Sequence, residues 1–181
     1  MCYNQRGLYA TVEGIDIMYK YLILAAGLIG IDQWTKALIV KNLSIGDQIE
    51  VISNFLYITS IRNRGAAWGI LEDHMSIFYA VTAVVIIAVV YAFYKYKSEH
   101  FTLHLSLSLV LAGALGNFID RMRYQEVVDF VQTVWGNYYF PIFNVADMCL
   151  SIGVVILMFY VLFGDKLNEK KRKKKGKYYF E

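Results

Sequence analysis

The stretch LGNFIDRMRYQEVVDF at residues 115–130, followed by PIFNVAD at residues 141–147, places polar side chains between two strongly apolar segments. Three aspartates and two asparagines are concentrated there, namely Asp120, Asp129, Asp147, Asn117 and Asn144. An Asp at the centre of a bilayer costs about 2.5 to 3.5 kcal/mol on insertion scales, so ionisable groups at membrane depth are candidates for chemistry or transport. We interpret the rest of the chain as a scaffold that holds Asp129 near Asp147.

The composition is that of a small polytopic membrane protein. Of the 181 residues, 57% are hydrophobic and 18% are charged, with a single proline. An ordinary soluble domain carries more charge and less apolar surface. The two cysteines, Cys2 and Cys149, lie far apart and lack metal-ligand spacing, so that neither a disulfide framework nor a zinc site is predicted.

Four apolar segments are each long enough to cross a hydrocarbon core of about 30 Å as a helix that rises 1.5 Å per residue. They cover approximately residues 21–40, 76–94, 102–119 and 143–163. Residues 44–61 instead contain β-branched and aromatic runs bounded by turn residues, which predicts a small sheet at the interface. The segment that follows Arg121, up to Phe140, predicts another strand pair with an aromatic belt.

The first seventeen residues, MCYNQRGLYATVEGIDI, are expected to form a disordered extension. They lack the basic start and the cleavage site of a secretory signal. Met18 opens a more typical first membrane segment, so the sequence leaves open whether Met1 or Met18 is the true start. The mass of the native amino terminus distinguishes the two.

The distribution of basic residues predicts the orientation in the membrane. With both termini in the cytoplasm, the cytoplasmic side holds Arg6, Lys20, Lys95, Lys97 and the eight basic residues of the tail 166–181, and six basic residues remain outside. The tail residues are Lys166, Lys170, Lys171, Arg172, Lys173, Lys174, Lys175 and Lys177, and the outer ones are Lys36, Lys41, Arg62, Arg64, Arg121 and Arg123. This bias follows the positive-inside rule. We expect a basic cytoplasmic tail that touches anionic lipid in preference to nucleic acid.

Several polar residues outside the opening stretch join the same outer face. Asp32 and Lys36 are four residues apart and can pair on one face of a helix, either as a self-neutralising pair at headgroup level or as a support for the site. The run RNRGAAW at residues 62–68 suggests polar recognition beside tight packing, or an interfacial turn anchored by Trp68. Asp120 is followed by Arg121, which favours a structural ion pair between them.

The histidines give little support for catalysis or metal binding. His100 and His104 have helical i, i+4 spacing, but they lie at the end opposite the carboxylates and lack a third ligand. His74 is the sole histidine near the outer face, where a cap or a surface position is its usual role. We therefore expect no metal and no cofactor.

Carboxylate chemistry remains once the other catalytic patterns are removed. No Ser/His or Cys/His pair reaches the outer face, and no glycine-rich phosphate cradle with a lysine is present. Two carboxylates held close together share a proton, because one pKa rises. One can activate water while the other donates to the carbonyl oxygen of a peptide bond. Asn144, three residues before Asp147, could orient a carboxylate or bind the substrate backbone.

At this point the chain resembles the bacterial lipoprotein signal peptidases, the type II signal peptidases of peptidase family A8. The resemblance runs from Met18 to the tail and rests on motifs in the same order, DQWTK at 32–36, RNRGAAW at 62–68, GNFIDR at 116–121, VVDF at 127–130 and FNVAD at 143–147. It implies an all-α membrane protein with four transmembrane helices and a small extracytoplasmic β-cradle. Its peptidase domain would cover residues 18–165. The amino-terminal extension is the one departure from the family pattern.

The resemblance also implies an activity and a set of site residues. The enzyme would be an aspartyl endopeptidase of the bacterial cell membrane that removes signal peptides from prolipoproteins, cutting on the amino side of the diacylglyceryl-modified cysteine, and it would be sensitive to globomycin. The implied residues are Asp129 and Asp147 for catalysis, Asn63, Asn117, Arg121 and Asn144 for substrate binding, and Asp32, Lys36, Gly65 and Asp120 for support. The implied partners are the diacylglyceryl-modified precursor and membrane lipid, with no nucleic acid, and the chain is expected to be a monomer.

Two functions of other classes stay open on the residues alone. A small proton-coupled transporter also uses intramembrane acids, although the chain has no internal repeat and no broken helix and gathers its acids at one face. A non-catalytic membrane assembly factor would use the outer loops for binding. Cleavage of a lipidated precursor separates both from a peptidase.

Overall fold

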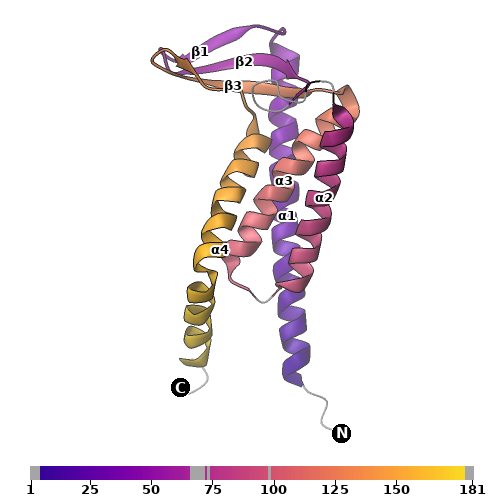
Figure 1. Cartoon of the computed structure of the whole chain (residues 1–181), viewed down its shortest axis with the longest axis vertical. Helices are drawn as coiled ribbons and strands as arrows, with labels where there is room; N and C mark the ends of the chain where they lie inside the picture. The colour runs from indigo at the N-terminus through magenta and orange to yellow at the C-terminus, as the bar shows by residue number, and fades with distance from the viewer. Residues whose placement is uncertain (1–4, 66–71, 73, 98, 178–181) are drawn as a thin grey trace.

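The structure is a computed structural model that describes residues 5–65, 72, 74–97 and 99–177. Its elements are α1 (Gln5–Asn42), β1 (Gln48–Ile52), β2 (Leu56–Asn63), α2 (Met75–Lys95), α3 (Phe101–Tyr124), β3 (Val127–Trp135), β4 (Tyr138–Tyr139) and α4 (Val145–Lys177). The helices form an elongated bundle, and the strands lie across one end of it (Figure 1).

Four helices in the described part of the chain are long and apolar enough to cross a membrane. The four spans are Met18–Asn42, Met75–Lys95, Phe101–Tyr124 and Val145–Glu169. They confirm the four predicted segments. The first three spans extend beyond both predicted limits, whereas the fourth begins two residues later and ends six residues later than predicted. Large apolar side chains remain exposed along the outer helices, for example Ile87 of α2 at 69% and Val161 of α4 at 75%. Such surfaces are compatible with lipid and not with water.

Helix α3 is the inner helix of the bundle. In the most apolar stretch of α3, 61% of the residues are buried inside the protein, against 11–17% in the corresponding stretches of the other three spans. Small residues of α3 allow this close packing. A Cβ added to Gly113 would lie 2.7 Å from the Leu150 backbone nitrogen, and one added to Gly116 would lie 2.7 Å from Asp32 Oδ2. The absence of a side chain at these positions therefore brings α4 and α1 against α3.

Both helices that carry the termini are longer than their membrane spans. Helix α1 begins at Gln5, so the backbone of residues 5–17 is helical, whereas the sequence pattern predicts disorder for residues 1–17. Residues 1–4 lie outside the described part. An existing helix elongates without a new nucleation cost, and the stable first span can therefore extend into this polar segment. Helix α4 likewise continues to Lys177, well beyond the predicted end of the span near residue 163.

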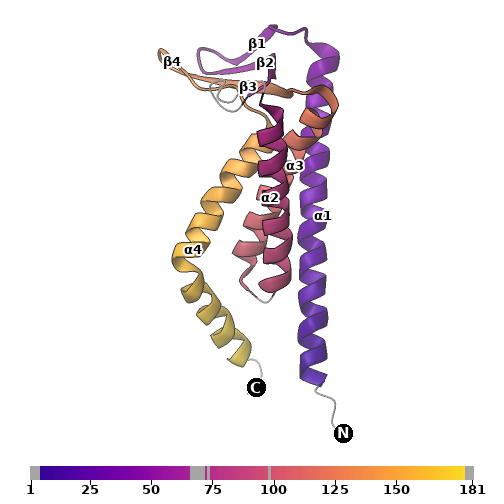
Figure 2. The same ribbon diagram turned by 45° about the vertical axis from the view of Figure 1, so that its right-hand side comes forward.

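The sheet is antiparallel, with the strand order β1-β2-β3-β4. It confirms the strands predicted within residues 44–61 and after Arg121. In the pairing of β2 with β3, Ile61 lies opposite Asp129 and Asn63 opposite Val127, with an irregularity between Ile58 and Ile61. Figure 2 shows the sheet as a thin layer over the ends of the helices, with both termini at the far end of the bundle. The end of β2 and the start of β3 thus bring polar residues to the place where the sheet meets the helices.

Candidate active site

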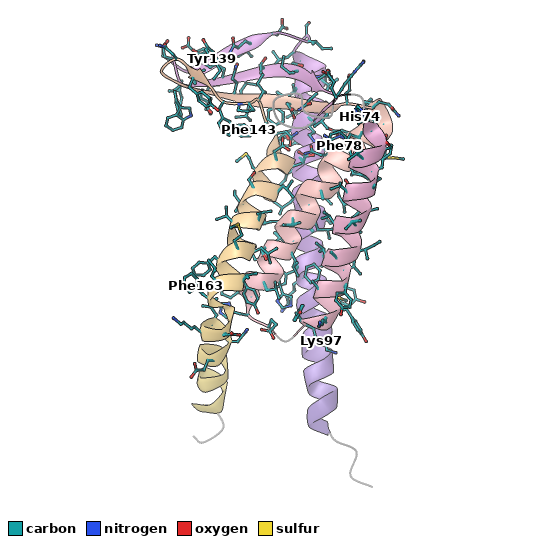
Figure 3. All side chains as sticks on the ribbon, in the orientation of Figure 1. His74, Phe78, Lys97, Tyr139, Phe143 and Phe163 are labelled. Atoms are coloured by element: carbon teal, nitrogen blue, oxygen red, sulfur yellow. The ribbon has the colours of Figure 1, made fainter. Side chains whose placement is uncertain are left out.

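A cavity of about 530 Å³ lies between the sheet and the beginning of α4. Its walls come from β2, α3, β3 and the segment that leads into α4, close to the labelled Phe143 in Figure 3. Six residues predicted for the site line it, namely Asn63, Gly65, Asn117, Arg121, Asp129 and Asp147. The remaining wall is largely apolar and includes Phe140, Ile142, Met148 and Ile152. Residues from distant parts of the chain therefore meet in one concave site.

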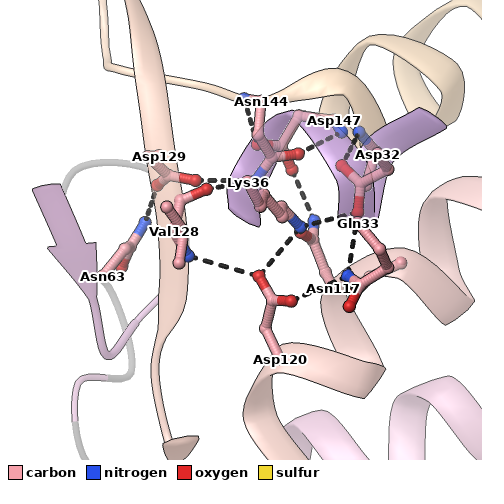
Figure 4. Close-up of polar contacts among 12 residues, drawn as sticks. Asp32, Gln33, Lys36, Asn63, Asn117, Asp120, Val128, Asp129, Asn144 and Asp147 are labelled. Carbon is pink, nitrogen blue, oxygen red and sulfur yellow. Dashed lines mark hydrogen bonds and ion pairs between the residues drawn. The ribbon is translucent and has the colours of Figure 1, made fainter. Parts of the chain in front are cut away.

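The two candidate catalytic carboxylates are joined through a single buried asparagine. Asn144 Nδ2 donates to Asp129 Oδ1 at 2.7 Å, and the backbone nitrogen of Asn144 donates to Asp147 Oδ2 at 3.1 Å. A second amide binds each carboxylate, because Asn63 Nδ2 donates to Asp129 Oδ2 at 2.9 Å and Asn117 Nδ2 to Asp147 Oδ1 at 2.7 Å (Figure 4). Three asparagines thus hold both carboxyl groups in fixed orientations.

The start of α4 explains why Asn144 and Asp147 adopt this arrangement. Asn144 Oδ1 accepts a hydrogen bond from the backbone nitrogen of Asp147 at 2.9 Å, while Asp147 reaches back to the backbone nitrogen of Asn144. These reciprocal bonds form a capping box with Asn as the cap and Asp three residues later. The same local motif that begins the helix therefore fixes one candidate catalytic carboxylate.

The buried position of Asn144 refines one prediction. Asn144 was expected among the substrate-binding residues, but its side chain is fully buried and bonded to Asp129, Asn117 and the Asp147 backbone. It does not belong to the cavity wall. Of the two possibilities that the sequence left open, the contacts agree with orientation of a carboxylate.

The surroundings of Asp129 favour its protonated form near neutral pH. Burial and the neighbouring negative charge of Asp147 raise the pKa of Asp129 to about 7. Hydrogen bonds from Asn63 and Asn144 act in the opposite direction and limit the rise. Asp129 and Asp147 can therefore share one proton under physiological conditions, which is the behaviour predicted for two close carboxylates.

Beneath the cavity lies a buried cation with two carboxylates. Lys36 Nζ is 2.9 Å from Asp32 Oδ2 and 2.9 Å from Asp120 Oδ2, and it donates to Asn117 Oδ1 at 3.0 Å. The side chains of all three charged residues are at most 4% exposed. The predicted pairing of Asp32 with Lys36 is confirmed, and the contacts of Lys36 with Asp120 and Asn117 agree with the alternative that the pair supports the site.

This ion cluster ties together four elements of the fold. Asp32 Oδ1, on α1, accepts from the Ala146 backbone nitrogen at the start of α4 at 2.8 Å. Asp120 Oδ2, on α3, accepts from the Val128 backbone nitrogen of β3 at 3.2 Å. Gln33 Nε2 donates to Asp120 Oδ1 at 2.8 Å. Gln33 had been assigned no role, although an amide beside Asp32 at membrane depth was a signal that could have identified it.

The predicted ion pair between Asp120 and Arg121 is wrong in its partner. Adjacent residues of a helix project about 100° apart, so Asp120 points to Lys36 while Arg121 points to the cavity. Arg121 Nη2 donates to the Gly65 carbonyl at 2.9 Å, and its guanidinium lies 4.2 Å from the centre of the Phe78 ring. The side chain is thereby positioned from both sides.

Other predicted candidates lie elsewhere. His74 is exposed near the start of α2, and His100 caps α3 at its amino-terminal end, far along the helix from Asn117 and Asp120. His104 is buried against Tyr21 and Phe93. Trp68 and the proposed interfacial turn fall within residues 66–71, outside the described part of the chain.

The protein has four helices that can span a membrane and a cavity lined by two aspartates. These features place it among the multi-pass membrane enzymes with carboxylates in the active site. A family model described as Signal peptidase (SPase) II matches residues 24–163. The chain belongs to this family.

Known relatives and solved structures agree with the family assignment. A lipoprotein signal peptidase of Listeria monocytogenes serotype 4b is 58% identical over 149 residues, which cover 82% of this chain and 96% of the relative. The lipoprotein signal peptidase of Bacillus pumilus is 51% identical over 146 residues, covering 81% and 94%. A solved bacterial membrane enzyme is 46% identical with a TM-score of 0.74, covering 79% of this chain and 87% of that one. A second such structure has a TM-score of 0.72 at the same identity, with coverages of 79% and 92%.

The ion cluster predicts a large effect for Lys36→Met. Loss of the cation leaves Asp32 and Asp120 buried without their charge partner, and removal of one member of a buried pair costs about 3 to 5 kcal/mol. We expect a clear fall in the thermal unfolding temperature of the purified protein in detergent. The exposed Lys41→Met serves as the matched control and should leave that temperature nearly unchanged. A triple change that also makes Asp32→Asn and Asp120→Asn should recover part of the loss, and equal stability of Lys36→Met and the parent would contradict the role of the cluster.

Proposed function

We propose that Asp129 and Asp147 are the catalytic pair with which this membrane peptidase cleaves prolipoproteins. As a member of the signal peptidase II family, with lipoprotein signal peptidases as relatives, the chain removes the signal peptide from prolipoproteins. The observation that carries the assignment of the residues is that two carboxylates line one cavity and are bridged by Asn144. The cut would fall on the amino side of the diacylglyceryl-modified cysteine.

The two aspartates would divide the proton transfers of peptide hydrolysis between them. Asp147 lies in the first turn of α4, where the helix dipole stabilises negative charge, and it would take a proton from the attacking water. Asp129, whose pKa is raised to about 7, would donate its proton to the carbonyl oxygen as the water oxygen bonds to the carbonyl carbon. The proton taken by Asp147 then passes to the leaving nitrogen as the carbon–nitrogen bond breaks. Asp129 recovers its proton from a hydroxyl group of the intermediate, which becomes the new carboxyl group.

The remaining polar residues would divide into substrate contacts and orienting groups. Arg121 lines the cavity, and we assign it to the backbone of the substrate. Asn63 lines the cavity from another wall, and because its amide also donates to Asp129, it would both orient that carboxylate and contact the substrate. Asn117 also lines the cavity, but its amide already donates to Asp147 and its oxygen accepts from Lys36 and Asn144. Its role would therefore be to orient Asp147, with Gly65 holding Arg121 in place.

The apolar part of the cavity suits the lipid of the precursor. Phe140, Ile142, Met148 and Ile152 line it, and Met148 and Ile152 also face outward on α4, with exposed fractions of 44% and 49%. The acyl chains could lie along this surface while the peptide reaches the aspartates. Because the precursor is already confined to the bilayer, little further structure is needed for binding.

Replacement of either aspartate by asparagine should abolish cleavage of a lipidated precursor in liposomes. Asn keeps the shape but cannot exchange the proton, and general acid–base catalysis contributes about 10²- to 10⁴-fold to rates. Asp165→Asn, an exposed acid farther along α4, is the control and should retain the parental rate.

A mixture of Asp129→Asn and Asp147→Asn proteins should remain inactive, as expected if one chain carries a whole site. Activity in either single variant would remove that residue from the mechanism, whereas recovery in the mixture would contradict a monomeric enzyme.

The raised pKa of Asp129 predicts that kcat/KM falls as the pH increases through about 7. Below this value Asp129 carries the proton that it must donate, and above it the pair becomes doubly ionised. Asn63→Ala removes a hydrogen bond that lowers the pKa of Asp129, so the descending limb of the profile should move to higher pH in that variant. A profile that stays flat from pH 6 to 9, or a limb that moves to lower pH in Asn63→Ala, would contradict the assignment of the acid.

The positive-inside bias supports an orientation with both termini in the cytoplasm and the aspartates outside. In a variant without Cys2, Ser53→Cys in the exposed turn between β1 and β2 should react with a membrane-impermeant maleimide in intact cells. Asp165→Cys, near the end of the α4 span, should react only after the cells are permeabilised. The reverse pattern would invert the topology.

A further inference from the structure

The free end of the sheet, away from the helices, has one apolar and one polar face. Residues that lie opposite each other on neighbouring strands share a face, and successive residues alternate. One row runs from Ile49 through Ile58 to Val131. The adjacent row, on the opposite face, runs from Glu50 through Tyr57 to Gln132. The sheet is therefore amphipathic across its thickness.

The apolar face continues to the tip of the sheet, where it is exposed. Along β3, alternation carries it from Val131 to Trp135, and Trp135 pairs with Tyr138 of β4. The exposed fractions are 52% for Ile49, 63% for Trp135 and 53% for Tyr138. The ring of Phe55 meets Trp135 edge-on with the centroids 5.1 Å apart, which fixes the indole in place without covering it.

The pairing of Val131 shows which way the apolar face points. Val131 lies opposite Phe143 in an antiparallel bridge, so both side chains leave the sheet on the same face. Phe143 lines the cavity between the sheet and the start of α4, and the apolar face is consequently the one that faces the helices. The free end extends sideways past α4 in two views (Figures 1 and 2), and side chains project there from the helix-facing side (Figure 3).

We propose that the helix-facing side of this free end, formed by Ile49, Trp135 and Tyr138, rests in the boundary between headgroups and acyl chains of the bilayer. Helix α4, past which the free end extends, is itself a membrane span with exposed apolar side chains. Trp and Tyr are the side chains that favour this boundary, since each has an apolar body and a polar group. The opposite face, with Glu50, Gln132 and the phenol of Tyr139, remains in water.

Contact with the bilayer would fix the depth of the catalytic strand. Trp135 and Asp129 belong to the same strand, β3, so that anchoring the tip holds the other end of the strand at a constant height above the helices. Amphipathic helices that lie in the interface insert their apolar side about 5 to 10 Å, and the sheet would insert to a similar depth. The contact is an interaction surface of the enzyme separate from the cavity that receives the substrate.

Fluorescence of a single tryptophan tests the proposal in the full-length protein. With Trp34→Phe and Trp68→Phe, Trp135 is the remaining tryptophan, and the protein is placed in liposomes of phosphatidylcholine brominated near the headgroup or near the chain ends. We expect blue-shifted emission that falls by more than half with the shallow bromines and less with the deep ones. The matched control carries Trp135→Phe and Gln132→Trp, which moves the indole to the polar face of the same strand, and its emission should be that of an indole in water, without quenching.

Cleavage of a lipidated precursor by both proteins verifies that they are folded. Equal quenching of the two indoles, or of neither, would overturn the proposal. If the emission wavelength of Trp135 varies with the protein-to-lipid ratio and the brominated lipids do not quench it, the face would be assigned to contact with a second copy of the chain. Quenching that disappears when the lipidated precursor is added would assign it to the acyl chains of the substrate, and either result would also overturn the bilayer contact.

Discussion

The buried ammonium of Lys36 is the group on which the rest of the structure depends. It lies between the carboxylates of Asp32 and Asp120 and contacts Asn117, and the two carboxylates bind backbone nitrogens of α4 and β3. Isolated charges are expensive to bury, but a charge that is paired and hydrogen-bonded on all sides can define one arrangement of the surrounding elements. Separating α1, α3, α4 or β3 from the others would leave part of this cluster without its partners.

The cluster also determines how the amides of the cavity are oriented. A lysine ammonium can only donate, so Asn117 must present its oxygen to Lys36 and its NH₂ group to Asp147. Asn144 then donates to Asn117 Oδ1 and to Asp129 Oδ1, and it accepts from the Asp147 backbone with its own oxygen. The direction of each hydrogen bond follows from the donor at the centre. Removal of Lys36 would affect the aspartates that it never touches, through the freedom that Asn117 would gain.

The sequence predicted the features that depend on local pattern and missed those that depend on tertiary contacts. Segment length and apolarity gave the four spans, β-branched runs gave the strands, and the i, i+4 spacing gave the pair of Asp32 with Lys36. The partner of Asp120 could not be read from its neighbour Arg121, because helical geometry sends the two side chains in different directions. The full burial of Asn144 depends on β3 lying over the start of α4, and the helix at residues 5–17 depends on continuation from a stable span. No local pattern encodes any of these three.

The distance of Lys36 from the catalytic pair is as important as its presence. The site holds four carboxylates and two cations, namely Asp32, Asp120, Asp129, Asp147, Lys36 and Arg121. When Asp129 and Asp147 share one proton, the site has one excess negative charge, and loss of that proton leaves two. A cation in direct contact with Asp129 would favour the doubly ionised state and remove the acid. Lys36 acts on Asp129 only at a distance, where its effect on the pKa is the smallest of the named causes, because Asn117 and Asn144 lie between them in the hydrogen-bond chain. The neutral amides of Asn117 and Asn144 thus fix the orientation of Asp129 without placing a positive charge next to it. The same buried cation can therefore hold the fold together while Asp129 keeps its proton near neutral pH.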